Sequence, residues 1–359
     1  MLADVTASSR APPPSAAPPR STSLPRYRRV EWCGEGSSGG VWRGQALETG
    51  EVVALRRVEG VAALERARQE LALVQSVTPH PHIRAVHTLC SGAQVISDHG
   101  EHSDEESESE PVAYLVMEYG EPAVERWQAE RWWERSATAW LQEARSVMRG
   151  VVAALAHLHD RGVVHGDVRS DNVFYCARTN PSGDRQESIV ALGDLSHARR
   201  WPAPDAPSLP AYAACRAHEC FLGDEGQPMA ADVWAAGCLA LELLWMRQPG
   251  MPVFDCGTGF PMSELRSLHA IWDWLGTPPS SLLQRCAEQH PDRPPLYVPS
   301  GRPSRLQERV QRAWAGRGAD ADEVQLAIDW VAHCFVYEPE LRMSAVQALQ
   351  HPWLRGNVS

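Results

Sequence analysis

The sequence predicts an α+β fold in which a small, sheet-rich lobe precedes a larger, mainly helical lobe. Residues 27–58 contain short β-branched runs separated by glycines, which is typical of strands joined by tight turns. Residues 144–162 and 231–246 carry apolar side chains at helical spacing, and the second segment is apolar almost all round. Strands first and helices later favour an α+β chain over an alternating α/β chain.

The predicted small lobe spans residues 27–119. Its first strands are RRVEW, VWRGQAL and EVVALRRV, and the glycine-rich turn GEGSSGG separates the first two. Residues 61–77 predict an amphipathic helix, and YLVMEY (114–119) predicts a buried strand. Between them lies an acidic run, residues 97–111, for which we expect an exposed loop. Its serines among carboxylates leave acid-directed phosphorylation open as an alternative role.

The predicted large lobe spans residues 120–355. A helix is expected over 144–162, with Gly162 placed to end it, and a buried helix over 231–246. Residues 1–26 are rich in Pro, Ala and Ser and lack the apolar stretch of a secretory signal. We therefore expect a disordered tail at this end of the chain.

Composition narrows the classes of function. The formal net charge of −11 argues against a nucleic-acid-binding surface as the main function. No run of 18 apolar residues is present, so a membrane span is not expected. The nine cysteines are scattered without a C-x-x-C pair, which favours a reducing, intracellular compartment, cytoplasm or nucleus.

The chain contains no lysine, because all 34 residues counted as Lys or Arg are Arg. Asparagine is nearly as rare, with three occurrences. Drift towards GC-rich codons explains this composition most simply. Selection against lysine, for example to avoid ubiquitin attachment, is the alternative.

Five short motifs follow one another along the chain. They are GEGSSGGV (34–41), VALR (53–56), HGDVRSDN (165–172), GDLS (193–196) and RAHE (216–219). A glycine motif of this kind is a weak signal alone, because it also opens dinucleotide-binding folds. There, however, the glycines lead into a helix, whereas here the following residues predict a strand.

In this order and spacing, the motifs resemble the glycine-rich loop, V-A-I-K, H-R-D-L-x-x-x-N, D-F-G and A-P-E motifs of the protein kinase superfamily. LGTPP (275–279) and the closing ELRMSAVQALQHPWL are similar to the cyclin-dependent-kinase branch. The resemblance covers roughly residues 27–355 and implies a bilobal protein-kinase fold. It also implies a serine/threonine kinase that transfers the γ-phosphoryl group of ATP to a protein substrate, with ATP and Mg²⁺ as cofactors.

The resemblance assigns the chemistry to a few polar residues. Asp167 would orient and deprotonate the substrate hydroxyl, and Arg169 would face the γ-phosphate. Asn172 and Asp194 would hold Mg²⁺. Because this chain has so little asparagine, an asparagine at the metal position favours retained metal binding.

The same resemblance places ATP between the glycine-rich turn and the strand 114–119. Glycines allow backbone N–H groups to approach the phosphates, Ala54 would pack on the base, and Met117 is the expected gatekeeper. Glu118 and Tyr119 would offer backbone groups to adenine. The residues expected around ATP are Gly34, Glu35, Gly36, Gly39, Val41, Ala54, Arg56, Glu70, Met117, Glu118 and Tyr119.

Arg56 stands where the family has the lysine that pairs with the phosphates and with a glutamate, here Glu70. Arginine is always charged, but its planar fork is bulkier than an ammonium group. One interpretation is a pocket refitted around arginine, in a slow enzyme. The alternative is a pseudokinase scaffold that binds a nucleotide or a partner without catalysis. The presence of Asp167, Asn172 and Asp194 favours the enzyme.

Regulation by phosphorylation of the activation segment is not expected. Gly166 replaces the arginine that grips the phosphate in the family, and residues 196–215 contain no threonine, only Ser196, Ser208 and Tyr212 as hydroxyl groups. The helix at 61–77 does not resemble the cyclin-binding helix of the branch, so cyclin dependence is not supported, although another regulatory protein partner remains compatible.

One expected contact is structural. His218 replaces the proline of A-P-E, whereas Glu219 is kept, and Arg342 is placed to pair with it in family terms. Such a pair supports the fold and says little about activity.

Overall fold

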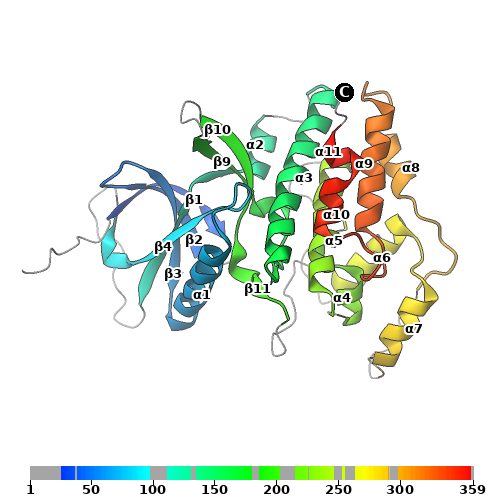
Figure 1. The fold of residues 1–359 in the computed structure, drawn as a ribbon, viewed down its shortest axis with the longest axis horizontal. Coiled ribbons are helices and arrows are strands. Elements are labelled where there is room, and N and C mark those ends of the chain that lie inside the picture. Colours follow the sequence, from blue (N-terminus) through cyan, green and yellow to red (C-terminus); the bar gives the residue numbers. More distant parts are fainter. Residues whose placement is uncertain are drawn as a thin grey trace, which may run out of the picture.

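The computed structural model describes residues 26–36, 39–97, 111–130, 135–179, 186–202, 215–224, 226–245, 253–254, 263–289, 291 and 298–356. Figure 1 shows a strand-rich N-terminal part at one end and a helical C-terminal part at the other. The hairpin of β9 (Val173–Thr179) and β10 (Gln186–Leu192) lies between them. The α+β prediction is thereby confirmed.

The N-terminal sheet has six strands in the order β4–β6–β3–β2–β1–β5. Their bounds are β1 Tyr27–Gly36, β2 Gly39–Ala46, β3 Val52–Glu59, β4 Val86–Ser91, β5 Val95–Ser97 and β6 Val112–Glu118. Neighbours are antiparallel, as in the small antiparallel-sheet lobe that the kinase resemblance implies, except β1 and β5, which are parallel. Because only the 3₁₀ turn η1 (Gly92–Gln94) joins β4 to β5, the sheet must curl until its two edges approach.

Helix α1 (Val61–Val77) has the predicted bounds and contacts β3 and β4. Ala67 and Val74 face the core, and the helix ends before Pro79, where a proline cannot supply the next N–H. Glu70 is the one charged residue among the buried residues of this helix. A buried carboxylate is costly unless it is paired, so the position of Glu70 calls for a cation.

The remaining elements build the helical part and its junction with the sheet. Their bounds are β7 Gly120–Pro122, α2 Ala123–Ala129, α3 Ala137–Asp160, β8 Val163–Val164, η3 Ser170–Asn172, η4 Leu195–His197, β11 Arg199–Arg200, α4 His218–Leu222, α5 Pro228–Trp245, α6 Ser263–Leu275, α7 Ser280–Gln289, α8 Leu306–Trp314, α9 Ala321–Cys334, α10 Ala345–Gln350 and α11 Pro352–Arg355. Helix α3 starts earlier than expected because Ser136 accepts a hydrogen bond from the N–H of Ala139 and caps the helix. At the other end Gly162 adopts φ +66°, the left-handed conformation predicted for it.

Helix α5 forms the centre of the helical part, as its nearly continuous apolar sequence predicts. By length and composition it is the one described helix that could cross a membrane, yet 83% of that window is buried inside the protein. Tryptophans surround it: the indole N–H of Trp140 donates to Leu243 O (2.9 Å) and that of Trp314 to Leu244 O (2.8 Å). These bonds pair the buried indole N–H groups of Trp140 and Trp314.

A buried ion pair fastens α4 to the C-terminal segment. Arg342 Nη1 donates to Glu219 Oε1 (2.7 Å) and Nη2 donates to Oε2 (2.9 Å), and both side chains are almost fully buried. The guanidinium also lies 4.9 Å from the ring centroid of Trp234. Next to the pair, buried His218 accepts a hydrogen bond from Trp272 Nε1 (3.0 Å), and burial lowers its pKa to about 3, so that it is neutral at ordinary pH.

Replacing Arg342 by methionine should destabilise the protein strongly, because it leaves the Glu219 carboxylate buried without its cation. We expect a loss of about 3–5 kcal/mol in the free energy of unfolding. The control is Arg312→Met, which removes an exposed pair with Glu308 and should cost less than about 0.5 kcal/mol. Urea unfolding followed by tryptophan fluorescence measures both, and equal losses would contradict the prediction.

Candidate functional site

Arg56 lies at the centre of the candidate site. It stands on β3, where Val41 of β2 is its cross-strand partner. Its Nη2 contacts Glu70 Oε2 on α1, and its Nη1 donates to Asp194 Oδ1 at 3.2 Å. The residue is only 6% exposed. One guanidinium therefore joins the sheet, helix α1 and the segment that follows β10.

The two carboxylates that share Arg56 respond differently to burial. Burial raises the pKa of Glu70, against the attraction of Arg56. Burial also acts to raise the pKa of Asp194, but the charge of Arg56 and the hydrogen bond from Ser196 outweigh it, so that the pKa lies below its ordinary value. Two polar atoms of this cluster, Arg56 Nε and Glu70 Oε1, are buried without hydrogen-bond partners among the described residues.

Asp194 has an unusual backbone. With φ 54° it is the one non-glycine residue with positive φ in the described parts of the chain. Its side chain accepts a hydrogen bond from the N–H of Ser196 (3.4 Å), and Leu195 is buried behind it. Strained conformations of this kind persist where the surroundings hold them, and they cluster at functional sites.

The loop between β8 and β9 brings Asp167 and Asn172 together. Asn172 Nδ2 donates to the backbone oxygen and to Oδ2 of Asp167, both at 2.8 Å. Because the amide nitrogen is engaged, the carbonyl oxygen of Asn172 is the atom that remains for a metal ion. Arg169 points its guanidinium at the neighbouring Asp171.

Asp232 of α5 fixes the start of this loop. Its carboxylate accepts hydrogen bonds from the backbone N–H groups of His165 (2.8 Å) and Gly166 (2.9 Å) and lies 2.9 Å from His159 Nε2. Gly166 has φ +80°, which glycine adopts without strain. The Nε2 atom of His165 lies 3.1 Å from the backbone oxygen of Gly193, the residue before Asp194. His165 therefore connects the loop that carries Asp167 and Asn172 to the segment that carries Asp194.

The glycine-rich turn joins β1 to β2, with Gly34, Glu35 and Gly36 on β1 and Gly39 opening β2. Residues 37–38 lie outside the described residues. At Gly39 an added Cβ would come within 2.3 Å of the backbone oxygen of Arg57, so the sheet itself requires glycine there. A role towards phosphate remains a prediction for these residues.

The residues expected around the base lie on β3 and at the end of β6. Ala54 and Met117 are cross-strand partners and buried, and Tyr119 is partly buried. The N–H of Glu118 donates to Ala85 O (2.9 Å), and its carbonyl accepts from Arg84 Nε (2.8 Å). Both backbone groups of Glu118 thus have partners within the protein in this structure, and their use by adenine stays a prediction.

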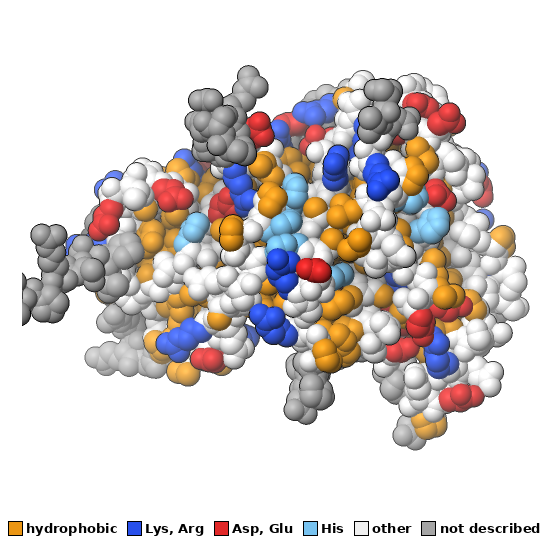
Figure 2. Space-filling model, viewed as in Figure 1, with side chains coloured by type: hydrophobic (Ala, Val, Ile, Leu, Met, Phe, Trp, Pro, Cys, Tyr) orange, Lys and Arg blue, Asp and Glu red, His pale blue; other side chains and the backbone are white. Residues whose placement is uncertain are grey.

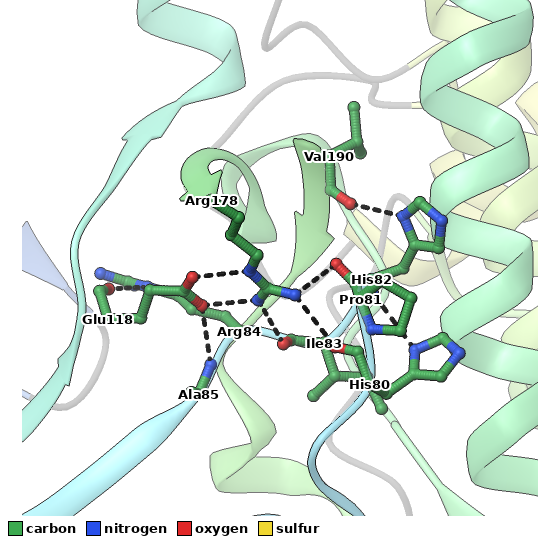
Figure 3. A network of polar contacts seen from close by, with 9 residues as sticks. All are labelled: His80, Pro81, His82, Ile83, Arg84, Ala85, Glu118, Arg178 and Val190. Atoms are coloured by element: carbon green, nitrogen blue, oxygen red, sulfur yellow. Dashed lines mark hydrogen bonds and ion pairs between the residues drawn. The ribbon is translucent and has the colours of Figure 1, made fainter. Parts of the chain in front are cut away.

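The side chain of Glu118 belongs to a polar network drawn in Figure 3. Arg178 of β9 donates to both carboxylate oxygens, Nε to Oε1 (2.7 Å) and Nη2 to Oε2 (2.6 Å). It also donates to the backbone oxygens of the loop before β4, among them Pro81 O (2.6 Å) and Ile83 O (3.0 Å). Burial alone would raise the pKa of Glu118, but these hydrogen bonds outweigh burial and lower it.

Three residues of this region were missed by sequence reasoning: Arg84, Phe174 and Arg178. The available signal was a single charge in the otherwise apolar approach to β4, HIRAV (82–86). A charge there was compatible with an exposed position, and its contact with Glu118 spans 34 positions in the chain. The activation-segment residues Ser208 and Tyr212 lie outside the described residues.

The residues at the Arg56 end fit a magnesium–phosphate group. The carboxylate of Asp194 and the amide oxygen of Asn172 are the hard oxygen ligands that Mg²⁺ prefers.

Away from this site, Asp329, His333 and His351 also lie close enough for a metal ion. There, however, His351 Nδ1 accepts the N–H of Trp353 (3.2 Å), so its Nε2 carries the proton shared with Asp329 and is not a free ligand.

Comparison with known proteins decides the family. The model of the protein kinase domain matches residues 27–354. The chain belongs to the protein kinase family. Among curated relatives, it is 25% identical over 343 residues to cyclin-dependent kinase B2-1 of Oryza sativa subsp. japonica, covering 91% of this chain and 89% of that protein. It is 27% identical over 352 residues to cell division control protein 2 homolog 2 of Trypanosoma brucei brucei, covering 94% and 85%.

These relatives support the bilobal protein-kinase fold and the cyclin-dependent-kinase-like branch that the motifs indicated. Serine/threonine kinases of that branch are transferases that act on proteins. Figure 2 shows arginine and acidic side chains interspersed over one face of the kinase, without one large area of a single sign.

Glu118→Gln should weaken the kinase fold in a pH-dependent way. Because the pKa of Glu118 is lowered in the folded protein, its ion pair stabilises the fold above the ordinary glutamate range. That stabilisation is lost as pH falls through the folded pKa. We expect a loss of about 1–3 kcal/mol in the free energy of unfolding at neutral pH, shrinking as pH falls below about 4.

Urea unfolding over a series of pH values measures this difference. Glu65→Gln is the control, because Glu65 forms an exposed pair with Arg68. A difference between wild type and Glu118→Gln that stays constant down to acid pH would show that the lost charge is not the cause.

Proposed function

We propose that this protein kinase is a slow, Mg²⁺- and ATP-dependent serine/threonine kinase that acts on a protein substrate. The observation that carries the proposal is the contact of Arg56 with both Glu70 and Asp194. An arginine in this place could have displaced its neighbours. Instead the pocket holds it between two carboxylates, as a site refitted around arginine requires.

Asp167 is the proposed base. Its Oδ2 accepts the amide hydrogen of Asn172, which orients the carboxylate and leaves Oδ1 for the proton of a substrate hydroxyl. The same bond turns the oxygen of Asn172 away, towards a position where it and Asp194 can ligate Mg²⁺. Bound Mg²⁺ would neutralise charge on the transferred phosphoryl group.

The remaining cations have supporting roles in this proposal. The positive charge of Arg56 attracts the phosphates, while Glu70 and Asp194 fix the position of its guanidinium group. Arg169 faces the γ-phosphate after leaving Asp171, a surface contact that costs little to break. The glycine-rich turn covers the phosphates with backbone N–H groups.

A second candidate function is a pseudokinase scaffold. The observation that favours it is the hydrogen bond from Arg84 to the carbonyl of Glu118, which engages a group that adenine would use. In this case the arrangement around Arg56 would preserve the shape of the domain for a protein partner. The relatives are named as cyclin-dependent kinases, but the α1 sequence does not favour a cyclin as that partner.

The two candidates differ in phosphoryl transfer. The purified kinase is incubated with Mg²⁺ and γ-³²P-ATP on a mixture of casein and histones. A slow kinase should label serine or threonine, and Asp167→Asn and Asp194→Asn should each reduce the rate by about 10²-fold or more. Asp160→Asn, an exposed change outside the site, should leave the rate unchanged.

Labelling that persists in Asp167→Asn and Asp194→Asn would point to a contaminating kinase and remove the support for the enzyme. An absence of labelling at high enzyme concentration, with a folded protein, would favour the scaffold.

A further inference from the structure

Arg84 is a buried cation inside the region expected to take the base. It follows Ile83 just before β4, and its own N–H donates to Leu192 O (2.9 Å), so its backbone is fixed against β10. The residue is 7% exposed. Burial lowers the pKa of Arg84, but a guanidinium stays charged in proteins. Burying such a charge is costly unless other groups in the protein stabilise it.

Three contacts fix where the side chain goes. Its Nε donates to Glu118 O at 2.8 Å. Its Cζ lies 4.1 Å from the centroid of the Phe174 ring, a cation–π contact. Its stem is packed so closely on Gly193 that an added Cβ would come within 2.9 Å of Arg84 Cδ. The guanidinium thus lies over Phe174, between the strand that carries Glu118 and the residue before Asp194.

Phe174 connects the two ends of the pocket. Beside Glu118's strand, a Cβ added to Gly120 would come within 2.9 Å of Phe174 Cβ, and at the other end a Cβ on Gly193 would meet the Phe174 ring at 2.9 Å. At this position the Phe174 ring offers a face for stacking, and the Glu118 carbonyl, which the kinase resemblance assigns to adenine, offers a hydrogen-bond acceptor. In this structure a flat guanidinium stacks there and donates its N–H.

We propose that Arg84 occupies the base subsite of this kinase and thereby sets its affinity for ATP. The proposal rests on the proposed nucleotide-dependent function and concerns only the base end of the site. The N–H of the guanidinium takes the place of the adenine amino group at the Glu118 carbonyl, and the plane of the guanidinium takes the place of the adenine ring over Phe174. ATP must therefore displace Arg84, which makes adenine the weakly bound part of the ligand.

Arg84→Val tests the proposal, because valine can reach neither Glu118 O nor the Phe174 ring face. Equilibrium binding of ATP·Mg²⁺ and of uncharged adenosine is measured with wild type and variant by calorimetry. We expect affinity for both ligands to rise on the order of 100-fold, since a charged hydrogen bond and a cation–π contact no longer compete. Affinity for magnesium tripolyphosphate, which has no base, should not rise.

The sign of the effect separates this proposal from simple electrostatics. Removing a cation from a site should weaken the binding of an anion, so a gain in ATP affinity must come from the base subsite. Arg66→Val, on the exposed side of α1, is the matched control and should leave all three affinities unchanged. Phe174→Leu is the second variant, for use if Arg84→Val does not fold. It keeps Arg84 but removes its stacking partner, and should raise the affinity for ATP and adenosine by a smaller factor.

Several results would overturn the proposal. An unchanged or reduced ATP affinity in folded Arg84→Val would show that Arg84 does not compete with the base. A wild-type preference for inosine triphosphate over ATP that reverses in the variant would show that Arg84 instead binds the oxygen of a 6-oxo purine. Because binding is measured without phosphoryl transfer, tight ATP binding by wild type would overturn the occupied subsite and leave the proposed kinase activity standing.

Discussion

The candidate functional site of this protein kinase depends on one shared guanidinium. Arg56 belongs to the sheet, Glu70 to helix α1 and the partly buried Asp194 to the segment after β10, and neither Arg56 nor Glu70 would be stable as an unpaired buried charge. Each carboxylate on its own would leave part of the guanidinium without a partner. Together they fix the helix against the sheet and hold Asp194 in its left-handed backbone conformation, which positions the residue proposed to bind Mg²⁺.

A second guanidinium gives the other end of the pocket a different character. Arg84 is held by a carbonyl, an aromatic ring and a close-packed glycine, and its neighbour Arg178 clamps the carboxylate of Glu118. At the Arg56 end the charged groups pair with one another but the amide oxygen of Asn172 is left for a ligand, whereas at the Glu118 end both backbone groups have partners within the protein. This difference explains why the sequence motifs alone leave both a slow enzyme and a scaffold open. Most of the motif residues lie around Arg56, so the motifs say little about the surroundings of Glu118.

Local signals predicted most of the fold. The periodicity of residues 61–77 defines α1, and the left-handed conformation of Gly162 follows from its place after an apolar helix. Parallel pairing of β5 with β1 could not be foreseen, because it depends on how far the sheet curls. The contacts of Arg84 were equally hidden, since a charge next to β4 is compatible with solvent until the tertiary fold places Glu118 and Phe174 beside it.

The exchange of lysine for Arg56 also changes the covalent chemistry that the pocket can undergo. Acetylation and ubiquitination of a side chain have lysine as their target. A chain without lysine offers no side-chain primary amine at this site. The candidate site around Arg56 should therefore not react with amine-directed electrophiles.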